Sequence, residues 1–509
     1  MLIKGGLVYD PLNDVHGEIR DIYIAQGKIA EKAADDLLLD AAGMIVMPGH
    51  IDIHTHLAGF SLNFGRFLGF EKSDLLMPTA WETGLLYIRQ GYTTVVNAAM
   101  AALEARQVFW ELADIPVLDK INLLLVGNNQ LVLELIRRKD KEKLYMYLAW
   151  LLRATGSYGL KAVNPGWGVS EGDLTPGQIV SELLEVNEAL SLPHSLHLHC
   201  PNLGKADSYK EILDAIKLSA GRRLHLAHLQ FHSYASWQEV PFVSAAEIVA
   251  QAINDNPAVT ADVGQIVFGR AVTISADISL LWELAGRVGR KPYFSKKLEG
   301  EGYCGFLPLS YNPRNYVNAS QWLTGLELFL LISNPWQVFL TTDHPNGGPF
   351  ISYPYLIRLL MDRDFREHMA LQVNKEALKH SNLLHIAREY DLQEIAIITS
   401  AGPARALGLK NKGHLGIGAD ADLVIYRPHS NYEEMFKNPV YVLKDGKVVV
   451  KNGQIVNTCQ GKTLLVELFE TTDTKNWLNP LFARNYSLNM ENFELTPAFL
   501  SAKGGCYIE

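Results

Sequence analysis

The heptapeptide HIDIHTH at residues 50–56 places three histidines within one short apolar stretch. Residues two apart share one face of a β-strand, so His54 and His56 project together while Thr55 turns to the other face. Two imidazoles on one face are suitable ligands for a divalent metal ion, although an HxH pair alone is often structural. His50 lies at the opposite end of the stretch, and we interpret it as a structural residue.

Four further candidate ligands stand at the ends of other apolar stretches. YGLKAV contains Lys161, SLHLHC contains His199, LHLAHL contains His228, and LTTD ends in Asp343. In (β/α)8 barrels the active site lies at the carboxyl ends of the strands, so these side chains would meet the HxH pair at one mouth. This set, in this order, matches a binuclear amidohydrolase site. A lysine amine bridges two metal ions only as a carbamate formed with CO₂, and otherwise Lys161 would be an ion-pair partner.

Several other histidines compete for these roles. His197 shares a strand face with His199 but lies one layer deeper, which favours core packing or support of a ligand. His225 precedes His228 by three residues, so a regular strand would place it on the opposite face. His232 and His344 could donate a proton or contact the metal ligands or the substrate, and the sequence does not choose between these roles.

Eight apolar strand candidates, separated mostly by helix-period segments, predict an α/β fold built on a (β/α)8 TIM-like barrel of the amidohydrolase type. The candidates are residues 50–56, 93–99, 121–127, 159–163, 195–200, 224–229, 259–265 and 337–343. Short alternating strands with glycine turns occupy both ends of the chain. We therefore expect a composite β domain from residues 1–49 and 413–457 around a metal-dependent barrel of residues 50–412. Residues 458–509 form a C-terminal extension that the sequence does not assign.

The connection between strands seven and eight is unusually long, with roughly seventy residues. It is rich in aromatic residues and carries several cations, among them Trp282, Tyr293, Phe294, Tyr303, Tyr311, Tyr316, Trp322, Lys296, Lys297 and Arg314. One interpretation is a set of extra helices with their own small core. The other is the wall of a substrate channel that offers ring surfaces and cations to a long, partly anionic ligand.

Charge and composition narrow the classes of protein. The 509 residues carry a formal net charge of −9, which argues against nucleic acid as the main partner. We find no apolar run of the roughly 18 residues that a membrane span needs. The four cysteines are scattered and form no CxxC pair, which indicates a reducing cytoplasmic location.

The motifs together resemble one branch of the amidohydrolase superfamily, namely the alpha subunit of formylmethanofuran dehydrogenase and the related alpha subunit of the bacterial formyltransferase/hydrolase complex. QFHSY and TTDHPNGGPF are the most specific of these motifs. The resemblance extends to about residue 455 and includes GYTTVVNAAM, VGNN, LPHSLHLH, QWLTGLEL and TSAGPARALGLKNKGHLGIGADADLVIY. Three departures from the family pattern lie around the expected mouth, at Ser61, Asn97 and Trp167.

The resemblance implies hydrolysis of N-formylmethanofuran to formate and the free amine, or the reverse condensation, within a complex of several subunits. It also implies two divalent metal ions, zinc being the expected metal, bridged by a carboxylated Lys161. The implied metal ligands are His54, His56, Lys161, His199, His228 and Asp343. We expect Asp343 to carry the proton, with help from His232 and Asn63. Substrate contacts are expected from Arg66, Asn164, Gln230, His344 and Asn346.

Two other classes of function stay open at this point. The chain could be another cyclic-amide hydrolase of the dihydropyrimidinase type, although the two specific motifs weigh against that. It could also be a catalytically impaired scaffold or carrier-binding subunit, and the substituted mouth residues keep that alternative open.

Overall fold

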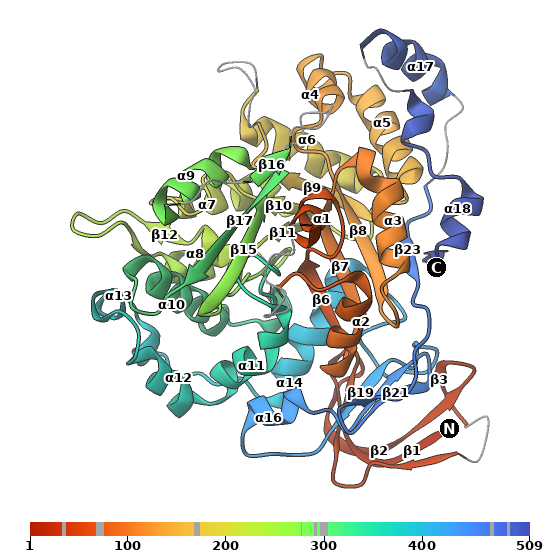
Figure 1. The fold of residues 1–509 in the computed structure, drawn as a ribbon, viewed down its shortest axis with the longest axis vertical. Helices are drawn as coiled ribbons and strands as arrows, with labels where there is room; N and C mark the ends of the chain where they lie inside the picture. The colour runs from red at the N-terminus through yellow and green to blue at the C-terminus, as the bar shows by residue number, and fades with distance from the viewer. Residues whose placement is uncertain are drawn as a thin grey trace.

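The computed structural model describes residues 1–32, 37–67, 76–166, 174–275, 277–289, 293–295, 304–468, 473–485 and 489–508. Among these residues, eight parallel strands form a nearly closed barrel at the centre of the molecule (Figure 1). They are β6 (His50–Thr55), β7 (Tyr92–Met100), β8 (Asp119–Leu125), β9 (Gly159–Val163), β10 (Leu196–His199), β11 (Leu224–Leu226), β14 (Val259–Asp262) and β18 (Val338–Phe339). A parallel bridge between Thr55 and His344 brings the last strand segment back to the first. The predicted barrel is confirmed.

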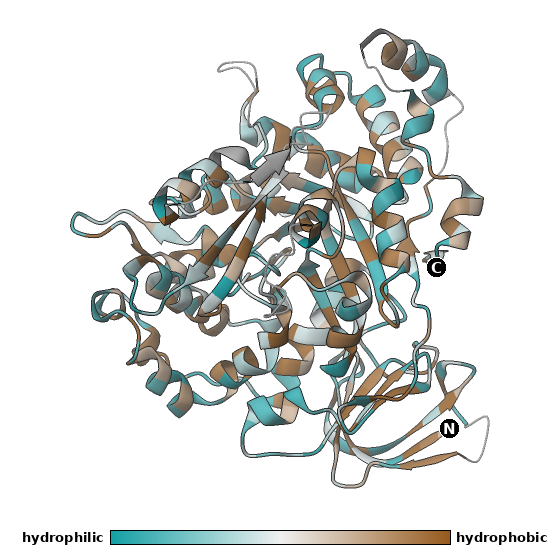
Figure 2. Ribbon diagram, in the orientation of Figure 1, coloured by the Kyte–Doolittle hydropathy of each residue, from teal (hydrophilic) through white to brown (hydrophobic). Residues whose placement is uncertain are grey.

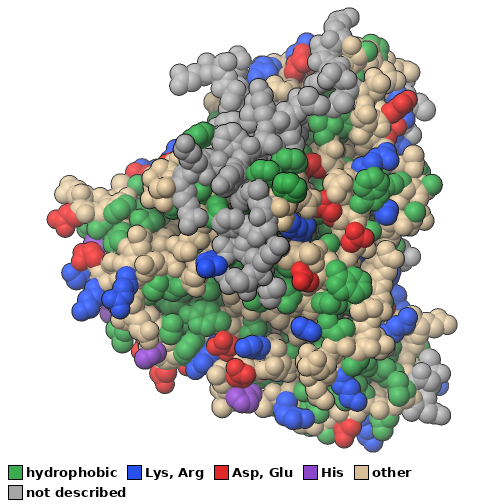
Figure 3. Space-filling view, in the orientation of Figure 1, with side chains coloured by type: hydrophobic (Ala, Val, Ile, Leu, Met, Phe, Trp, Pro, Cys, Tyr) green, Lys and Arg blue, Asp and Glu red, His purple; other side chains and the backbone are tan. Residues whose placement is uncertain are grey.

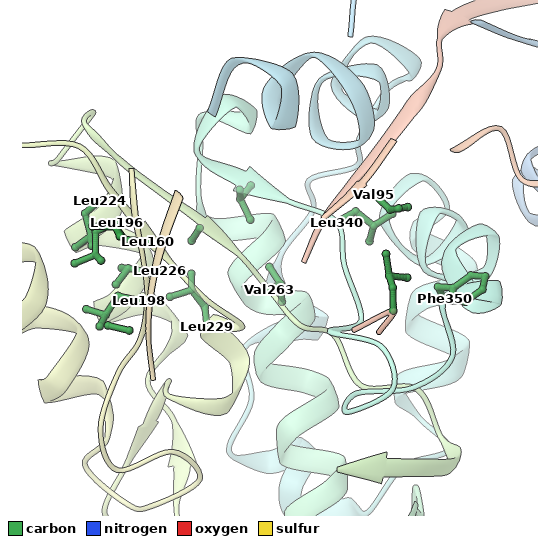
Figure 4. Close-up of a cluster of buried hydrophobic side chains, with 14 of the residues drawn as sticks. Val95, Leu160, Leu196, Leu198, Leu224, Leu226, Leu229, Val263, Leu340 and Phe350 are labelled. Carbon is green, nitrogen blue, oxygen red and sulfur yellow. The ribbon is translucent and has the colours of Figure 1, made fainter. Parts of the chain in front are cut away.

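Helices cover the outside of the barrel because each strand alternates between two kinds of neighbour. In β10, Leu196 and Leu198 pack outward in the same apolar cluster as Ile179 and Leu183 of the helix before it, and Figure 4 shows the leucines of β9, β10 and β11 gathered there. His197 and His199 take the alternate positions, which face the barrel interior. The covering helices are α2 (Ala80–Arg89), α3 (Ala105–Ala113), α4 (Gln130–Arg137), α5 (Lys141–Ala154), α6 (Pro176–Ala189), α7 (Tyr209–Ser219), α8 (Ala246–Asn254), α11 (Tyr353–Met361) and α15 (Gly402–Leu407).

Helix α6 illustrates how local sequence sets an element's start. Thr175 accepts a hydrogen bond from the Gln178 backbone, and the Gln178 side chain accepts one from the Thr175 backbone, so both halves of a capping box are present. Pro176 occupies the first turn, where its missing N–H costs nothing. The helix begins where the sequence predicts it.

Strands from both ends of the chain share one mostly antiparallel sheet beside the barrel, at the lower right of Figure 1. Its N-terminal strands are β1 (Leu2–Asp10), β2 (Val15–Ala25), β3 (Lys28–Ala30), β4 (Leu38–Asp40) and β5 (Ile45–Pro48). Its C-terminal strands are β19 (Leu423–Tyr426), β20 (Tyr441–Lys444), β21 (Lys447–Lys451) and β22 (Gln454–Ile455). The antiparallel pairing of β19 with β5 joins the two halves.

The long connection after strand seven builds structure over the barrel mouth. It contains β15 (Gly269–Ser275), α9 (Ile278–Val288), β16 (Tyr293–Ser295), β17 (Cys304–Tyr311) and α10 (Tyr316–Leu331). The strands β15, β17 and β16 form a small antiparallel sheet. Trp322 is fully buried in the barrel's own apolar cluster. Lys296, Lys297 and Tyr303, which the sequence places in this connection, lie outside the described residues.

The C-terminal segment packs against the barrel. Its strand β23 (Thr463–Leu465) pairs in parallel with β8, and β24 (Gly505–Tyr507) pairs with β23. The helices α17 (Asp473–Asn485) and α18 (Pro497–Ala502) lie in the same segment, and Trp150 of α5 donates a hydrogen bond to Glu494 between them.

Five further helices lie outside these groups. They are α1 (Phe60–Phe67), α12 (Arg363–Ala370), α13 (Lys375–Lys379), α14 (Leu392–Ala396) and α16 (Tyr432–Lys437). The apolar residues concentrate along the barrel strands and the helix faces against them (Figure 2), whereas acidic and basic side chains are interspersed on the described surface of Figure 3. No helix among the described residues is long and apolar enough to span a membrane.

Candidate active site

One cavity of about 490 Å³ opens at the carboxyl ends of the barrel strands. All six predicted metal ligands line it: His54, His56, Lys161, His199, His228 and Asp343. Its walls come largely from the long connection after strand seven, through β15, α9, β17 and α10. These walls include Tyr311 and Arg287 among mostly aliphatic and carboxamide side chains. The connection therefore walls the cavity and also contributes Trp322 to the core, so both interpretations of it are partly right.

The first group of donors gathers around Asp343. The Nε2 atoms of His54 and His56 lie 3.2 Å and 3.0 Å from its Oδ1 atom. Asn346 donates a hydrogen bond from Nδ2 to the other oxygen at 3.0 Å, which fixes the carboxylate plane. Two imidazole nitrogens and one carboxylate oxygen are a donor set that zinc accepts.

The second group of donors joins His199 and His228. The Nδ1 atom of His199 and the Nε2 atom of His228 lie 2.9 Å apart, so both imidazoles direct a nitrogen at one point. His228 adopts a left-handed backbone with φ of 37°. A Cβ atom on Gly264 would lie 2.4 Å from the His228 Cβ, so the neighbouring strand end tolerates only glycine beside this turn.

Lys161 lies buried inside the barrel mouth. Its Nζ atom has no hydrogen-bond partner among the described residues. Burial lowers the pKa of Lys161 to about 8, against the opposing effect of Asp262 and Asp343. Since an unpaired buried ammonium group is costly, this site favours the neutral amine or a derivative of it.

Asp262, at the end of β14, supports both groups of donors and is not among the residues predicted from the sequence. Its Oδ2 atom accepts hydrogen bonds from His54 Nδ1 at 2.8 Å and His225 Nε2 at 3.1 Å. Its Oδ1 atom accepts one from the His228 backbone at 2.8 Å. Burial would raise the pKa of Asp262, but His54 and His225 hold it well below its usual range. An aspartate within the apolar stretch VTADVGQ was the available signal, because a buried carboxylate needs partners.

The prediction that His225 faces away from the site is wrong. Its ring lies in the barrel interior against His197, with ring centroids 4.4 Å apart, and contacts Asp262. The strand β11 ends at Leu226, and the left-handed turn at His228 ends the two-residue alternation. His225 and His228 therefore both face inward. His197 lies one layer below the mouth, as predicted, with Nε2 3.1 Å from His54 Nδ1.

The remaining predicted residues divide by position. Asn346 lines the cavity, whereas Asn63 and Arg66 are not among its described lining residues. Arg66 donates hydrogen bonds to the carbonyl of Leu57 at 3.0 Å and to Asn63 at 3.2 Å, and Asn63 donates one to Glu111. These contacts anchor the loop that follows the HxH pair. Catalytic and substrate-binding roles for Asn63 and Arg66 stay predictions.

Four other predicted residues surround the site without appearing among the described lining residues. Asn164 donates to Asp277 at 2.8 Å, and Gln230 lies fully buried. His344 packs its ring edge-on against Phe350. His232 stacks on His228, with centroids 5.4 Å apart, and burial lowers its pKa to about 3. Their roles also stay predictions, and Trp167 lies outside the described residues.

A parallel barrel with histidines on strands one, five and six, a lysine on strand four and an aspartate after strand eight defines a class of hydrolases. The model of the Amidohydrolase family matches residues 76–455, and the chain belongs to that family. Within it, the chain is 38% identical to protein FwdA of Methanocaldococcus jannaschii, over 98% of this chain and 97% of that protein. It is 35% identical to the alpha subunit of the formyltransferase/hydrolase complex Fhc of Methylorubrum extorquens, over 99% and 98%.

The fold agrees with this relationship. The structure is similar to a chain of the formyltransferase/hydrolase complex FhcABCD from Methylorubrum extorquens, which was solved in complex with methylofuran. The TM-score is 0.94 with 34% sequence identity, and the match covers 100% of both chains. The resemblance inferred from the sequence motifs is thereby confirmed.

Proposed function

We propose that this protein hydrolyses N-formylmethanofuran, or a close analogue, to formate and the free amine, or catalyses the reverse condensation. It would act as the amidohydrolase subunit of a formyltransferase/hydrolase-type complex, in contact with the other subunits. The observation that carries the proposal is the convergence of six potential metal ligands at one cavity, in a chain similar along its whole length to the Fhc alpha subunit. The same full-length similarity favours this reaction over cyclic-amide hydrolysis.

The residues present fit a pair of divalent metal ions, with zinc as the proposed metal. His54, His56 and Asp343 would hold one ion, and His199 and His228 the other. Lys161 would bridge them as a carbamate, which forms when its neutral amine adds to CO₂ and loses a proton. The buried Nζ atom, with no hydrogen-bond partner among the described residues, supports this modification. When bound, such ions polarise a carbonyl group and lower the pKa of a coordinated water toward neutrality.

Asp343 is the residue placed to move the proton. Its carboxylate lies at the cavity surface, and Asn346 holds one oxygen while the other faces the two histidines. In hydrolysis the carboxylate accepts a proton from the attacking water and delivers it to the nitrogen of the departing amine. Protonation is required because an amine anion is a poor leaving group, and general acid–base assistance of this kind contributes about 10²- to 10⁴-fold.

The shape of the cavity suits a formyl group attached to a larger carrier. The polar donors lie at its floor, whereas aliphatic residues such as Leu280, Leu284 and Leu309 form part of the walls. An apolar wall excludes water from the reacting carbonyl and contacts the non-reacting part of the ligand.

A formate-release assay tests the proposal. The full chain, purified with its natural partner subunits and loaded with zinc, is incubated with N-formylmethanofuran and, separately, with hydantoin. We expect formate from the first substrate and no ring opening of the second. Ring opening of hydantoin without formate release would support the cyclic-amide alternative, and tight carrier binding without formate release would support a carrier-binding subunit.

A further inference from the structure

Beneath the proposed metal ligands, a row of buried histidines runs down the barrel interior. His54 Nδ1 lies 3.1 Å from His197 Nε2, and His197 Nδ1 lies 3.2 Å from His194 Nε2. At the far end, His194 Nδ1 lies 2.9 Å from the carbonyl oxygen of Ala406, just before the end of α15. All three imidazoles are at most 1% exposed.

We infer that His194 and His197 are positioning residues that fix the tautomer of His54, so that its Nε2 lone pair faces the cavity. This inference rests on the proposed role of His54 as a metal ligand. It assigns a role to two histidines that lie outside the cavity wall.

The proton positions follow from the fixed end of the row. A carbonyl oxygen only accepts hydrogen bonds, so His194 carries its proton on Nδ1. Burial lowers the pKa of His194 to about 3, which keeps its ring neutral and leaves Nε2 as an acceptor. That acceptor requires the proton of His197 to be on Nδ1, so the Nε2 atom of His197 is in turn an acceptor.

The acceptor on His197 then faces His54. The Nδ1 proton of His54 lies between two acceptors, His197 Nε2 at 3.1 Å and Asp262 Oδ2 at 2.8 Å. With the proton on Nδ1, the Nε2 atom of neutral His54 is a bare lone pair beside Asp343. A metal-binding histidine needs this state, and its partners at the other nitrogen set ligand orientation and basicity.

The alternative proton order conflicts with the structure. If His197 carried its proton on Nε2, its nearest acceptor there would be Asp262 Oδ2 at 3.6 Å, too long for a good hydrogen bond. His194 would then carry its proton on Nε2, and its bare Nδ1 would face the Ala406 oxygen, lone pair against lone pair. The Ala406 carbonyl therefore determines which nitrogen of His54 faces the cavity.

Substitutions at His194 test this inference, because this residue touches none of the proposed metal ligands. In H194Q the amide can still donate to Ala406 and accept from His197, so we expect zinc affinity within about threefold of wild type. In H194N the shorter amide reaches Ala406 but leaves His197 without its acceptor. In H194F both interactions are lost. For H194N and H194F we expect zinc affinity about 10- to 100-fold lower.

A matched control is Y158F. Tyr158 is fully buried near the same end of the barrel and donates a hydrogen bond to the carbonyl of Leu407 at 2.8 Å, outside the histidine row. This variant should lose thermal stability without losing zinc affinity. The measurement is the zinc content of the full chain across a series of metal-buffered solutions, with circular dichroism to verify folding. If H194F does not fold, H194N against H194Q provides the same comparison.

The outcomes separate this inference from the proposed function. Wild-type affinity in both H194N and H194F would refute the positioning role while leaving the metal centre intact. Wild-type protein that binds no zinc would refute the metal centre and the positioning role together. Zinc binding without formate release would refute the proposed substrate and leave the positioning role standing.

Discussion

Replacing Asp262 with asparagine should weaken metal binding although Asp262 is not a proposed ligand. The carboxylate accepts from two imidazole N–H groups on Oδ2 and from the His228 backbone N–H on Oδ1. An asparagine has one acceptor oxygen, and its amide nitrogen is a donor. In either orientation that nitrogen faces at least one N–H group. The ring of His54 can relieve the conflict only by moving its proton to Nε2, which removes the lone pair that binds metal.

The magnitude follows from the number of contacts disrupted. A buried donor left facing another donor costs about 1–3 kcal/mol. Because the metal-free state can avoid that cost by the proton shift and the metal-bound state cannot, the cost appears in the binding free energy. At about 1.4 kcal/mol for each tenfold change, zinc affinity in D262N should fall about 5- to 150-fold.

D52N is the matched control. Asp52 is also fully buried, in β6 beneath the mouth, and accepts from the hydroxyls of Tyr87 and Tyr353 on Oδ2 and from the His54 backbone on Oδ1. Hydroxyls can accept as well as donate, so an asparagine oriented with its oxygen toward His54 satisfies all three contacts. Zinc titration in metal-buffered solution should show near wild-type affinity for D52N. Equal affinities for D262N and wild type would refute the assigned role of Asp262.

Three further predictions concern single groups. K161A should lose the binuclear centre and recover part of it with added short carboxylic acids, measured as zinc per chain; two ions per chain in K161A alone would argue against a bridging role. D343N should retain some zinc yet lose about 10²- to 10⁴-fold in formate release, and unchanged turnover would contradict the proton transfer. Burial raises the pKa of Glu327 above its usual 4.5, so the stability it contributes is present below that value and is lost as pH rises through the raised folded pKa. E327Q should remove this fall, measured as the wild-type-minus-variant difference in unfolding free energy by urea titration between about pH 4 and 7; an unchanged pH dependence would contradict it.

The barrel and its proposed ligands could be predicted because their signals are local. Apolar stretches bounded by helix-period segments identify strands, and the position of a residue at a strand's carboxyl end places it at the mouth. His54, His56 and Asp343 each follow from that rule without knowledge of any contact. Lys161 and His199 follow in the same way from their own strands.

The supporting residues could not be predicted because their roles depend on contacts across the barrel. Asp262 and His194 act through atoms on other strands or on α15, and strand register and barrel stagger decide which atoms meet. The face of His225 was mispredicted because the left-handed turn at His228 interrupts the alternation. Arg66 shows the same limit, since its contacts with Leu57 and Asn63 depend on how α1 follows the strand.

Zinc-edge anomalous diffraction from crystals of the zinc-loaded protein tests the proposed metal centre most directly. We expect two peaks at the barrel mouth, one beside His54, His56 and Asp343 and one beside His199 and His228. We also expect electron density that extends beyond the Nζ atom of Lys161 and bridges the two peaks. A single peak, or two peaks with Lys161 unmodified and away from both, would contradict the binuclear carbamate-bridged centre.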